Sequence, residues 1–406
     1  MKRKIDAKDI EIGMYIAELD RPWLESPFLF QGFAVTSQGD INELERCCKY
    51  VLIDEDRSNY EKAEPLSSRM SMKEHGKKSK TKFVRPAHLI SVEKELSKAQ
   101  KVRKVAEKQV SSLMQQARVG KALDIKQANS VVGDIIESLV RSPDAMVLLG
   151  SMKSHGNDAE AHAINTSILA ITLGRFMKFS HEIIEELGIA ALLHDVGEVK
   201  VPTELIGNGA KTPEEIALVR KHTTFGAEIL RNTKGIARSA VDVAYSHHEQ
   251  VDGNGYPRKL TVGEISIFVK IVSIVDTYDM LTRGNGDDSI SATEALRYLY
   301  LYRDKIFDGK LTEVFIKCLG IYPVGSLVEL ETGEVGIVVS VQPGALLLPT
   351  LLLVKGRDKK SYEKPLIMNL ATFAKNEPNK YVVKQVLPPD AYGIDMRSFL
   401  LSAQLI

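Results

Sequence analysis

The sequence predicts an α+β protein that is mainly α-helical, with a small α/β domain at the N-terminus and a β-rich extension at the C-terminus. Three observations predict this class. Apolar residues recur at helical spacing through the middle of the chain. Short apolar runs of strand length, separated by glycines, precede that region and return after Gly320. The 406 residues allow two or three domains.

The N-terminal domain is expected at residues 1–63, where a regulatory or dimerising role would suit its place before a larger domain. Its expected strands are Phe28–Phe30, Phe33–Val35 and Tyr50–Ile53. A single helix is expected at Ile41–Lys49. Residues 64–87 are rich in Lys and Ser and have little to bury, which predicts a flexible basic linker. A nucleic-acid-binding arm is the less favoured alternative.

A helical domain is expected at residues 88–320. Its first helix carries apolar residues at intervals of three and four, from Val92 to Leu113, which favours an amphipathic helix packed on its own domain over a dimerising coiled coil. The further expected helices are Ile164–Phe176, Glu182–Leu193, Pro213–Leu230, Ile236–His248, Ile265–Leu281 and Ala292–Tyr302.

Residues 321–406 are expected to form the β-rich extension. The residue pattern changes there from helical spacing to short runs rich in Val, Ile and Leu. Strands are expected at Leu327–Leu330, Gly336–Val339 and Leu351–Val354, and the end of the chain, Ser398–Ile406, is expected to be a short helix or a tail.

Composition excludes several classes of function. The 54 basic and 53 acidic residues nearly cancel, so there is no global charge that favours a nucleic-acid polymer. No apolar run is long enough for a membrane span, and the chain turns acidic at Asp6 before an apolar signal segment develops. The three cysteines form no CxxC pair, which indicates a reducing compartment. A cytoplasmic protein is expected.

Histidines and acidic residues concentrate in the helical region. His194-Asp195 and His247-His248 each close a helical segment, and Asp276 interrupts an apolar run. Burying an unpaired carboxylate or imidazole costs on the order of several kcal/mol. A metal ion is the strongest compensating charge for such a site. Mixed imidazole and carboxylate ligands suit Fe, Mn, Zn, Co or Ni rather than Ca.

Each motif has an ordinary structural explanation when it is taken alone. A His-Asp pair is common at a capped helix end, and Asp276 could pair with Lys270. Their joint occurrence on separate helical segments favours a metal site.

The order His162, His194-Asp195, His222, His247-His248-Glu249, Asp276 resembles the HD superfamily of metal-dependent phosphohydrolases. Gly255-Tyr256-Pro257 matches the signature of its HD-GYP branch. The resemblance covers about residues 159–336. Shorter matching segments are Ala163–Asn165, Val201–Pro202, Ile274–Asp279 and Leu319–Ser326. The N-terminal domain is similar to a small uncharacterised domain that often precedes HD-GYP domains in bacteria.

The resemblance implies a phosphodiesterase for a cyclic dinucleotide, cyclic di-GMP first and 3′,3′-cyclic GMP-AMP second. The product would be the linear dinucleotide, mononucleotides or both. Two divalent transition-metal ions are implied, Fe or Mn, with Ni, Co or Zn as alternatives. A hydroxide bridging them would attack phosphorus, with His194 and Asp195 as the catalytic residues. The implied ligand sets are His162, His194, Asp195 and Asp276 for one ion, and Asp195, His222, His247 and His248 for the other.

Two further features follow from the resemblance. Some members bind a third metal through a carboxylate at the position of Asp158, one turn before His162; a solvated aspartate at a helix start is the equal alternative. The loop of Gly255, Tyr256 and Pro257 would shape the surroundings of the site and contact a partner such as a diguanylate cyclase or another signalling protein. The loop is also ordinary turn chemistry. A homodimer is a further candidate assembly.

The chain departs from the family pattern twice. Glu198 stands where the family usually has a lysine that approaches the substrate phosphate, and Lys200 is the candidate substitute. Beyond Asp276, where many relatives are basic, only Arg283 remains to pair with phosphate, followed by an acidic, Gly-rich loop at residues 284–288. Both changes bear on substrate affinity and choice, whereas every implied metal ligand is present.

Two other functions remain open. Glu198 and the acidic loop favour a metal-loaded receptor or scaffold that binds a cyclic dinucleotide with little turnover. The HD superfamily also contains hydrolases of other phosphoesters, such as linear dinucleotides and nucleotides.

Overall fold

The computed structural model describes residues 2–20, 33–35, 38–54, 91–152, 158–206, 211–283, 289–342, 347–374, 381–389 and 391–402. The expected strand Phe28–Phe30, the linker 64–87 and the loop 284–288 lie outside these residues. The chain divides into two compact units. The N-terminal unit comprises residues 1–80 with 342–347, and the main unit comprises residues 81–341 with 348–406.

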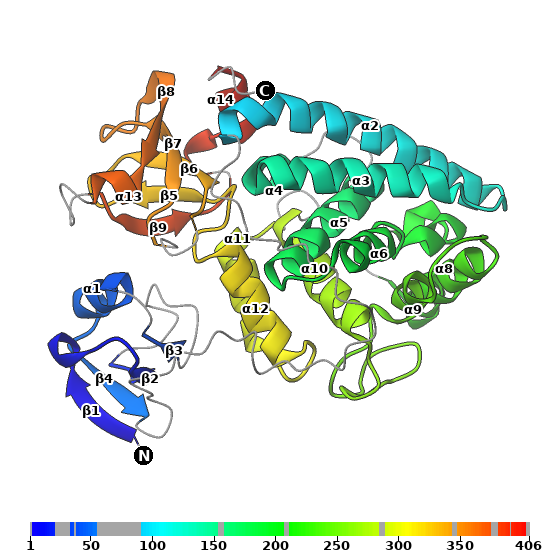
Figure 1. Cartoon of the computed structure of the whole chain (residues 1–406), viewed down its shortest axis with the longest axis horizontal. Coiled ribbons are helices and arrows are strands. Elements are labelled where there is room, and N and C mark those ends of the chain that lie inside the picture. The colour runs from blue at the N-terminus through cyan, green and yellow to red at the C-terminus, as the bar shows by residue number, and fades with distance from the viewer. Residues whose placement is uncertain are drawn as a thin grey trace. The chain divides into compact units, whose positions relative to one another are not determined.

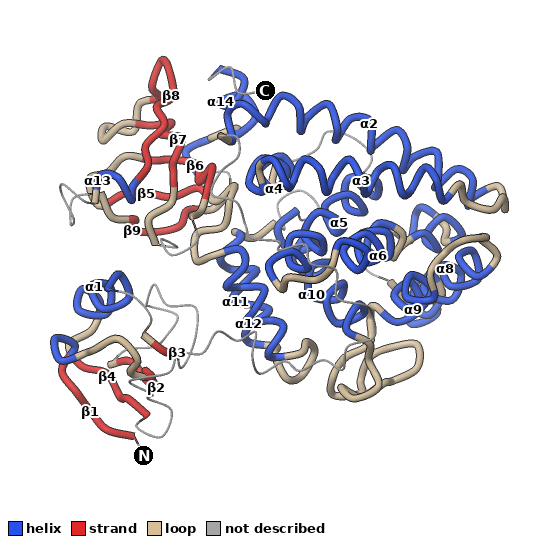
Figure 2. Tube along the Cα trace, viewed as in Figure 1, coloured by secondary structure: helices blue, strands red, loops and turns tan. Residues whose placement is uncertain are grey.

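The N-terminal unit is a four-stranded antiparallel sheet of order β1-β4-β2-β3, accompanied by helix α1 (Figures 1 and 2). Its core joins Ile16, Val51 and Ile53 of the sheet to Leu44 of α1. The edge strand β1 exposes the charged run Lys2–Lys4, which protects its free edge from further pairing. The elements are β1 (Lys2–Asp6), β2 (Tyr15–Leu19), β3 (Phe33–Ala34), α1 (Gln38–Cys47) and β4 (Tyr50–Asp54).

Helices form most of the main unit (Figure 2). Helix α2 buries Leu96, Ala99, Val110 and Leu113 against α3, α4 and α5, so its apolar stripe is covered within the same unit. The helices are α2 (Val92–Arg118), α3 (Ile125–Arg141), α4 (Pro143–Gly150), α5 (Asp158–Phe176), α6 (His181–Leu192), η4 (Val196–Lys200), α7 (Pro213–Arg220), α8 (His222–Arg231), α9 (Arg238–Ser246), α10 (Ile267–Arg283), α11 (Ala292–Leu301) and α12 (Gly309–Leu319).

The helical segment expected over Pro213–Leu230 is interrupted. Helix α7 starts with a capping box of Thr212 and Glu215 and ends at Arg220. Lys221 then makes a tighter turn, with its N–H donating to the carbonyl of Leu218, and α8 starts afresh at His222. The interruption sets the position of His222.

A five-stranded antiparallel sheet of order β8-β7-β6-β5-β9 closes the chain. The three expected strands are present as β5, β6 and β7, and two more, β8 and β9, complete the sheet. Asp144 of α4 accepts hydrogen bonds from the Ser340 hydroxyl (2.6 Å) and the Val341 N–H (3.3 Å), which fixes β6 to the bundle. The elements are β5 (Leu327–Leu330), β6 (Val335–Ser340), β7 (Thr350–Lys355), β8 (Ser361–Asn369), α13 (Leu370–Phe373), β9 (Val383–Leu387) and α14 (Met396–Ser402).

The mainly helical α+β class is therefore confirmed, with a strand-rich region at each end of the described chain. Among the described helices, none combines the length and the apolar character that crossing a bilayer requires.

Candidate metal centre

Five segments of the main unit bring histidines and aspartates to one place. His162 lies on α5, His222 opens α8, and Asp276 lies within α10. The pair His194-Asp195 connects α6 to η4, and His247-His248 follows α9. Within the described residues, two groups have ligand atoms within 4.8 Å of one another: Asp195, His222, His247 and His248 form one, and His162, His194 and Asp195 form the other.

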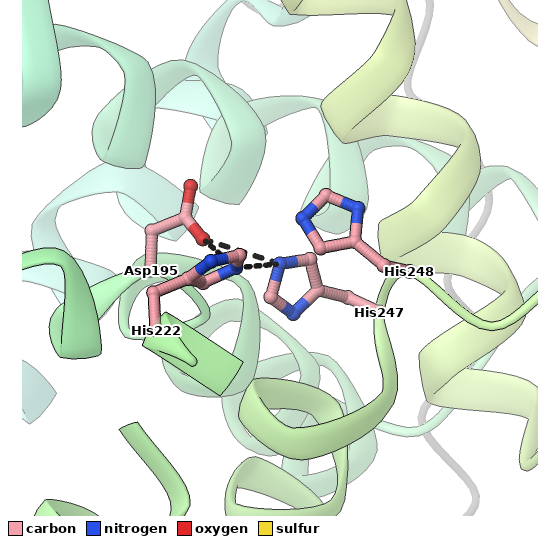
Figure 3. A group of neighbouring side chains, drawn as sticks. All are labelled: Asp195, His222, His247 and His248. Carbon is pink, nitrogen blue, oxygen red and sulfur yellow. Dashed lines mark hydrogen bonds and ion pairs between the residues drawn. The ribbon is translucent and has the colours of Figure 1, made fainter. Parts of the chain in front are cut away.

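Asp195 belongs to both groups, and each of its oxygens faces a different one. Oδ1 lies 3.1 Å from Nε2 of His247 and 3.5 Å from Nε2 of His222 (Figure 3). Oδ2 lies 3.1 Å from Nε2 of His194 and 3.8 Å from Nε2 of His162. One carboxylate therefore stands between two half-sites.

Asp276 completes the second half-site. Its Oδ1 lies 3.1 Å from Nε2 of His162 and 3.7 Å from Nε2 of His194. The α10 segment around it is buried and apolar, so the carboxylate has been placed among residues that could not solvate it.

Backbone carbonyls orient three of the rings. The Nδ1–H groups of His194, His222 and His247 donate to carbonyls of the preceding turn, at 2.7 Å (Ala191), 2.8 Å (Val219) and 3.0 Å (Val243). A donating Nδ1 leaves the Nε2 lone pair available, and this is the arrangement that metal-binding histidines adopt. All three Nε2 atoms face Asp195.

The donor set fits divalent transition metals. Within the described part of the chain, Nε2 of His162, Nε2 of His194 and Oδ1 of Asp195 are buried without a hydrogen bond. The Nε2 atoms of His222 and His247 approach to 3.3 Å, so two lone pairs face each other. Cations between these atoms would satisfy all of them, and mixed imidazole and carboxylate donors suit first-row metals.

The histidines and carboxylates of the cluster shift one another's pKa values. Burial alone would lower the pKa of His162, but the neighbouring carboxylates of Asp276 and Asp279 outweigh it and raise the pKa to about 10. Burial opposes ionisation of Asp195 as well, yet the positive charge of His194 holds the pKa of that carboxyl well below its usual range. Protonated His162 and His194 thus supply positive charge that metals would supply in the loaded site, whereas burial lowers the pKa of His222 and His248.

Glu198 is a half-buried neighbour of this cluster. Burial, reinforced by the negative charge of Asp195, raises the pKa of Glu198 to about 8. In the metal-free protein its side chain is therefore largely neutral at pH 7. Glu198 thus removes the positive charge of the family lysine without adding a full negative charge.

Two close backbone approaches explain glycines at the site. A Cβ on Gly197 would lie 1.9 Å from the carbonyl oxygen of His222 and 2.4 Å from the N of Gly226, so only glycine lets η4 pack on α8. A Cβ on Gly255 would lie 2.3 Å from the N of Gln250. Gly255 therefore lets the Tyr256 loop fold back onto the segment that follows His248.

Glu249 and His248 hold the Tyr256 loop. The buried Glu249 carboxylate accepts the N–H groups of Arg258 (2.6 Å) and Leu260 (2.8 Å). The Tyr256 ring stacks on His248, with centroids 4.7 Å apart and planes inclined by 24°. The guanidinium carbon of Arg220 lies 4.8 Å from the centre of the same tyrosine ring.

Sequence reasoning missed the residues that orient His162. Oδ2 of Asp279 lies 2.8 Å from its Nδ1, and Oδ1 of Asp279 accepts from the Asn165 amide at 2.9 Å. The Arg103 guanidinium of α2 in turn donates to the Asn165 carbonyl oxygen at 2.7 Å. Both Asn165 and Asp279 lie in segments that resembled the family, and their helical spacing of three from His162 and Asp276 was the available signal.

The remaining expected residues lie away from the Nε2 face of the cluster or cannot be placed. Arg283 pairs with Asp279 at 3.5 Å, on the Nδ1 side of His162. Lys200 is exposed, and its Nζ lies 5.6 Å from the ring centre of Phe225. Asp158 begins α5, but its side chain lies outside the described residues.

A separate cavity of about 390 Å³ lies between α5, α10 and the C-terminal sheet. Asn165, Asp279 and Arg283 line it, but no member of the two histidine groups does. The cavity is thus adjacent to the residues that orient His162, and distinct from the metal centre.

Two family models and several curated proteins match this chain. Residues 145–311 match the family model of an HD domain, and residues 2–128 match a domain of unknown function (DUF3391). The chain is 31% identical over 361 residues to a cyclic di-GMP phosphodiesterase of Pseudomonas aeruginosa, a match that covers 86% of this chain and 84% of that protein.

Two further relatives match the helical region. The chain is 33% identical over 172 residues to a cyclic di-GMP phosphodiesterase of Thermotoga maritima, covering 41% of this chain and 47% of that one. It is 27% identical over 173 residues to a 3′3′-cGAMP-specific phosphodiesterase of Vibrio cholerae, covering 42% of this chain and 33% of that one. The chain thus spans less than half the length of either.

A helical bundle with paired His/Asp clusters able to hold metal, joined through one aspartate, defines the class of HD-domain metal hydrolases. Given the extended match to the Pseudomonas protein and the Tyr256 loop, the chain belongs to the HD-GYP family of HD-domain phosphodiesterases.

Proposed function

We propose that this chain hydrolyses cyclic di-GMP, with 3′,3′-cyclic GMP-AMP as the second candidate substrate, at a site that binds two divalent transition metals. The placement of Asp195 carries the proposal, because its two oxygens each face a separate set of histidine Nε2 atoms. The names of the Pseudomonas, Thermotoga and Vibrio relatives support the choice of substrates.

The proposed ligand sets follow the two half-sites. Iron or manganese would occupy them, with nickel, cobalt and zinc as alternatives. Asp195 would bridge the two ions. The sets are His162, His194, Asp195 and Asp276 for one ion, and Asp195, His222, His247 and His248 for the other. A third ion at Asp158 remains part of the proposal.

Two such ions would supply Lewis acidity toward the phosphoryl oxygens of a phosphodiester. The chain's own residues prepare the site for this role. Carbonyls of the preceding turns hold His194, His222 and His247 in one tautomer, and Asp279 does the same for His162. The Tyr256 ring stacks on His248, so that this imidazole is only partly exposed at the edge of the cluster.

Hydrolysis of both candidate substrates tests the proposal. Protein purified without added metal would be reconstituted with Fe(II) or Mn(II), and the linear dinucleotide and mononucleotides would be separated by chromatography. We expect turnover that is lost when Asp195 is replaced by alanine. Undiminished turnover in Asp195→Ala would contradict the assignment of the site.

Glu198 favours a second candidate function, a metal-loaded receptor for the same ligand with little turnover. Its carboxyl group lies beside Asp195 where relatives usually carry a lysine. If the loaded protein binds cyclic di-GMP without hydrolysing it, the variant Glu198→Lys should gain turnover. Rapid hydrolysis by the unaltered protein would exclude the receptor function.

The remaining assignments concern the surroundings of the site. We propose that residues 1–63 regulate the helical domain, and that the exposed Pro257 edge of the Tyr256 loop contacts a signalling protein such as a diguanylate cyclase. A cytoplasmic location is proposed on the cysteine pattern of the sequence. Co-purification of a cyclase with the unaltered protein, lost in Pro257→Asp, would support the proposed contact, and sedimentation would determine whether the chain dimerises.

A further inference from the structure

We propose that Arg220 binds the phosphate of the cyclic dinucleotide that is not under attack, and thereby selects substrates with two phosphodiester groups. This inference rests on the proposed function and deepens it. Sequence patterns do not single out Arg220, which is one of several basic residues in the segment around His222.

The position of Arg220 in the chain and its contact with Tyr256 place it at the rim of the metal centre. It is the last residue of α7, two positions before His222, so the backbone of a proposed ligand holds its Cα close to the cluster. Its guanidinium carbon lies 4.8 Å from the centre of the Tyr256 ring, which in turn stacks on His248 at 4.7 Å. Tyr256 thus contacts both His248 and Arg220.

The charge of Arg220 is available for a ligand. The side chain is exposed, and its guanidinium forms no ion pair with any residue that the structure describes. A planar guanidinium on an aromatic ring keeps its N–H edge free, and that edge matches two oxygens of a phosphate. By contrast, Arg283 pairs with Asp279 behind His162, and Lys200 lies over Phe225.

The position of Arg220 determines which phosphate it can reach. The phosphodiester under attack would bind the metals held by the histidines, and would therefore lie on the side of their Nε2 atoms. The guanidinium of Arg220 has a ring contact with Tyr256 and with none of the proposed ligands that the structure describes, so we infer that it meets a different group of the substrate. A cyclic dinucleotide carries a second phosphodiester on the opposite side of its ring, and this group would extend toward the rim.

A comparison of two substrates tests the proposal. Cyclic di-GMP has two phosphodiesters, whereas bis(p-nitrophenyl) phosphate has one. In the metal-loaded protein, Arg220→Ala should raise KM for cyclic di-GMP about tenfold or more, the loss expected for a charge-assisted hydrogen bond. Turnover of bis(p-nitrophenyl) phosphate should not change, and Arg220→Lys should recover only part of the affinity because lysine lacks the planar fork.

Arg231 provides a matched control. It is also an exposed arginine at the last position of a helix, with its guanidinium carbon 5.6 Å from the ring centre of Tyr245. It lies about 13 Å along α8 from His222, from the rise per residue of a helix. Arg231→Ala should leave KM for both substrates unchanged. Metal content and melting temperature, measured for each variant, show that the fold and the metal centre are intact.

The outcomes separate this inference from the proposed function. An unchanged KM for cyclic di-GMP in Arg220→Ala, or an equal loss on both substrates, overturns the role of Arg220 alone. If the unaltered protein hydrolyses neither substrate, calorimetric binding of cyclic di-GMP to the manganese-loaded protein decides instead. Tenfold weaker binding in Arg220→Ala then supports the role of Arg220 in a receptor, and absence of binding to the unaltered protein overturns both proposals.

Discussion

Oδ2 of Asp279 lies 2.8 Å from Nδ1 of His162, on the side of the imidazole that faces away from the other histidines. A carboxylate in this position fixes the ring orientation and increases the basicity of the opposite nitrogen. Replacing Asp279 with asparagine keeps the shape and removes the charge. We expect the affinity for one of the two metals to fall about 10–100-fold.

Manganese titration by calorimetry would measure this loss. Asp308→Asn is a suitable control, because Asp308 also pairs with a cation, Lys270 at 3.2 Å, and asparagine retains its role as the N-cap of α12. Equal manganese affinity in Asp279→Asn and the unaltered protein would show that His162 needs no carboxylate behind it.

The shared position of Asp195 predicts unequal losses of metal. Removal of a bridging carboxylate weakens both half-sites, whereas removal of Asp276 weakens only the one that it faces. After desalting, elemental analysis should find about two metals per chain in the unaltered protein, about one in Asp276→Ala, and close to none in Asp195→Ala. Retention of one full equivalent by Asp195→Ala would contradict the bridging role.

Metal binding should strengthen as the pH rises. Burial opposes protonation of His162, but Asp276 and Asp279 raise its pKa from 6.5 to about 10 in the metal-free protein, so the ring is protonated at pH 7 and must release a proton to bind metal. The stability of the metal-free fold changes with pH in the opposite direction. The contribution of protonated His162 to the free energy of unfolding is complete below about pH 6.5 and is lost as the pH rises through about 10.

Calorimetric manganese titrations at two pH values below 9, each in buffers of different ionisation enthalpy, would report both the affinity and the protons released. A pH-independent affinity without proton release would contradict the protonated state of the metal-free cluster.

Two glycine substitutions should have opposite effects on stability. In Gly197→Ala the new Cβ would lie 1.9 Å from the carbonyl oxygen of His222, so η4 must separate from α8, and we expect a loss of about 2–4 kcal/mol in the free energy of unfolding. Gly133 lies inside α3 with nothing within 4 Å of its Cβ position. Gly133→Ala should gain about 0.5–1 kcal/mol through helix propensity. Urea denaturation measures both, and a neutral Gly197→Ala would show that the packing of η4 can relax.

The histidines and aspartates of the candidate metal centre could be proposed from sequence because each is hard to explain otherwise. Asp276 interrupts the buried apolar segment of α10, and His194-Asp195 follows the buried end of α6. The cost of burial makes such residues conspicuous, and the structure brings all seven proposed ligands into two overlapping groups.

The residues that surround those ligands could not be found in this way. Arg103 meets Asn165 across 62 positions of sequence, and Asp279 meets His162 across 117. Helical spacing gives the face on which each residue lies, but it does not say which faces meet. Sequence could not indicate the role of Arg220 either, because Arg220 approaches the cluster only through Tyr256, whose loop folds back onto His248. The end of α7 before Lys221 could not be predicted, because the apolar spacing of α7 continues into α8.

The hydrogen bond from Arg103 to Asn165 has a consequence for the modularity of the chain. The match to the domain of unknown function runs to residue 128, inside α3, and therefore includes Arg103. The compact units instead separate between residues 80 and 81. A chimera joined at residue 128 would exchange helix α2 of the phosphodiesterase core, and with it the Arg103 donor to the Asn165 carbonyl oxygen. A chimera joined at residue 80 would leave that core whole. The segment matched by the domain of unknown function and the compact N-terminal unit thus end at different positions.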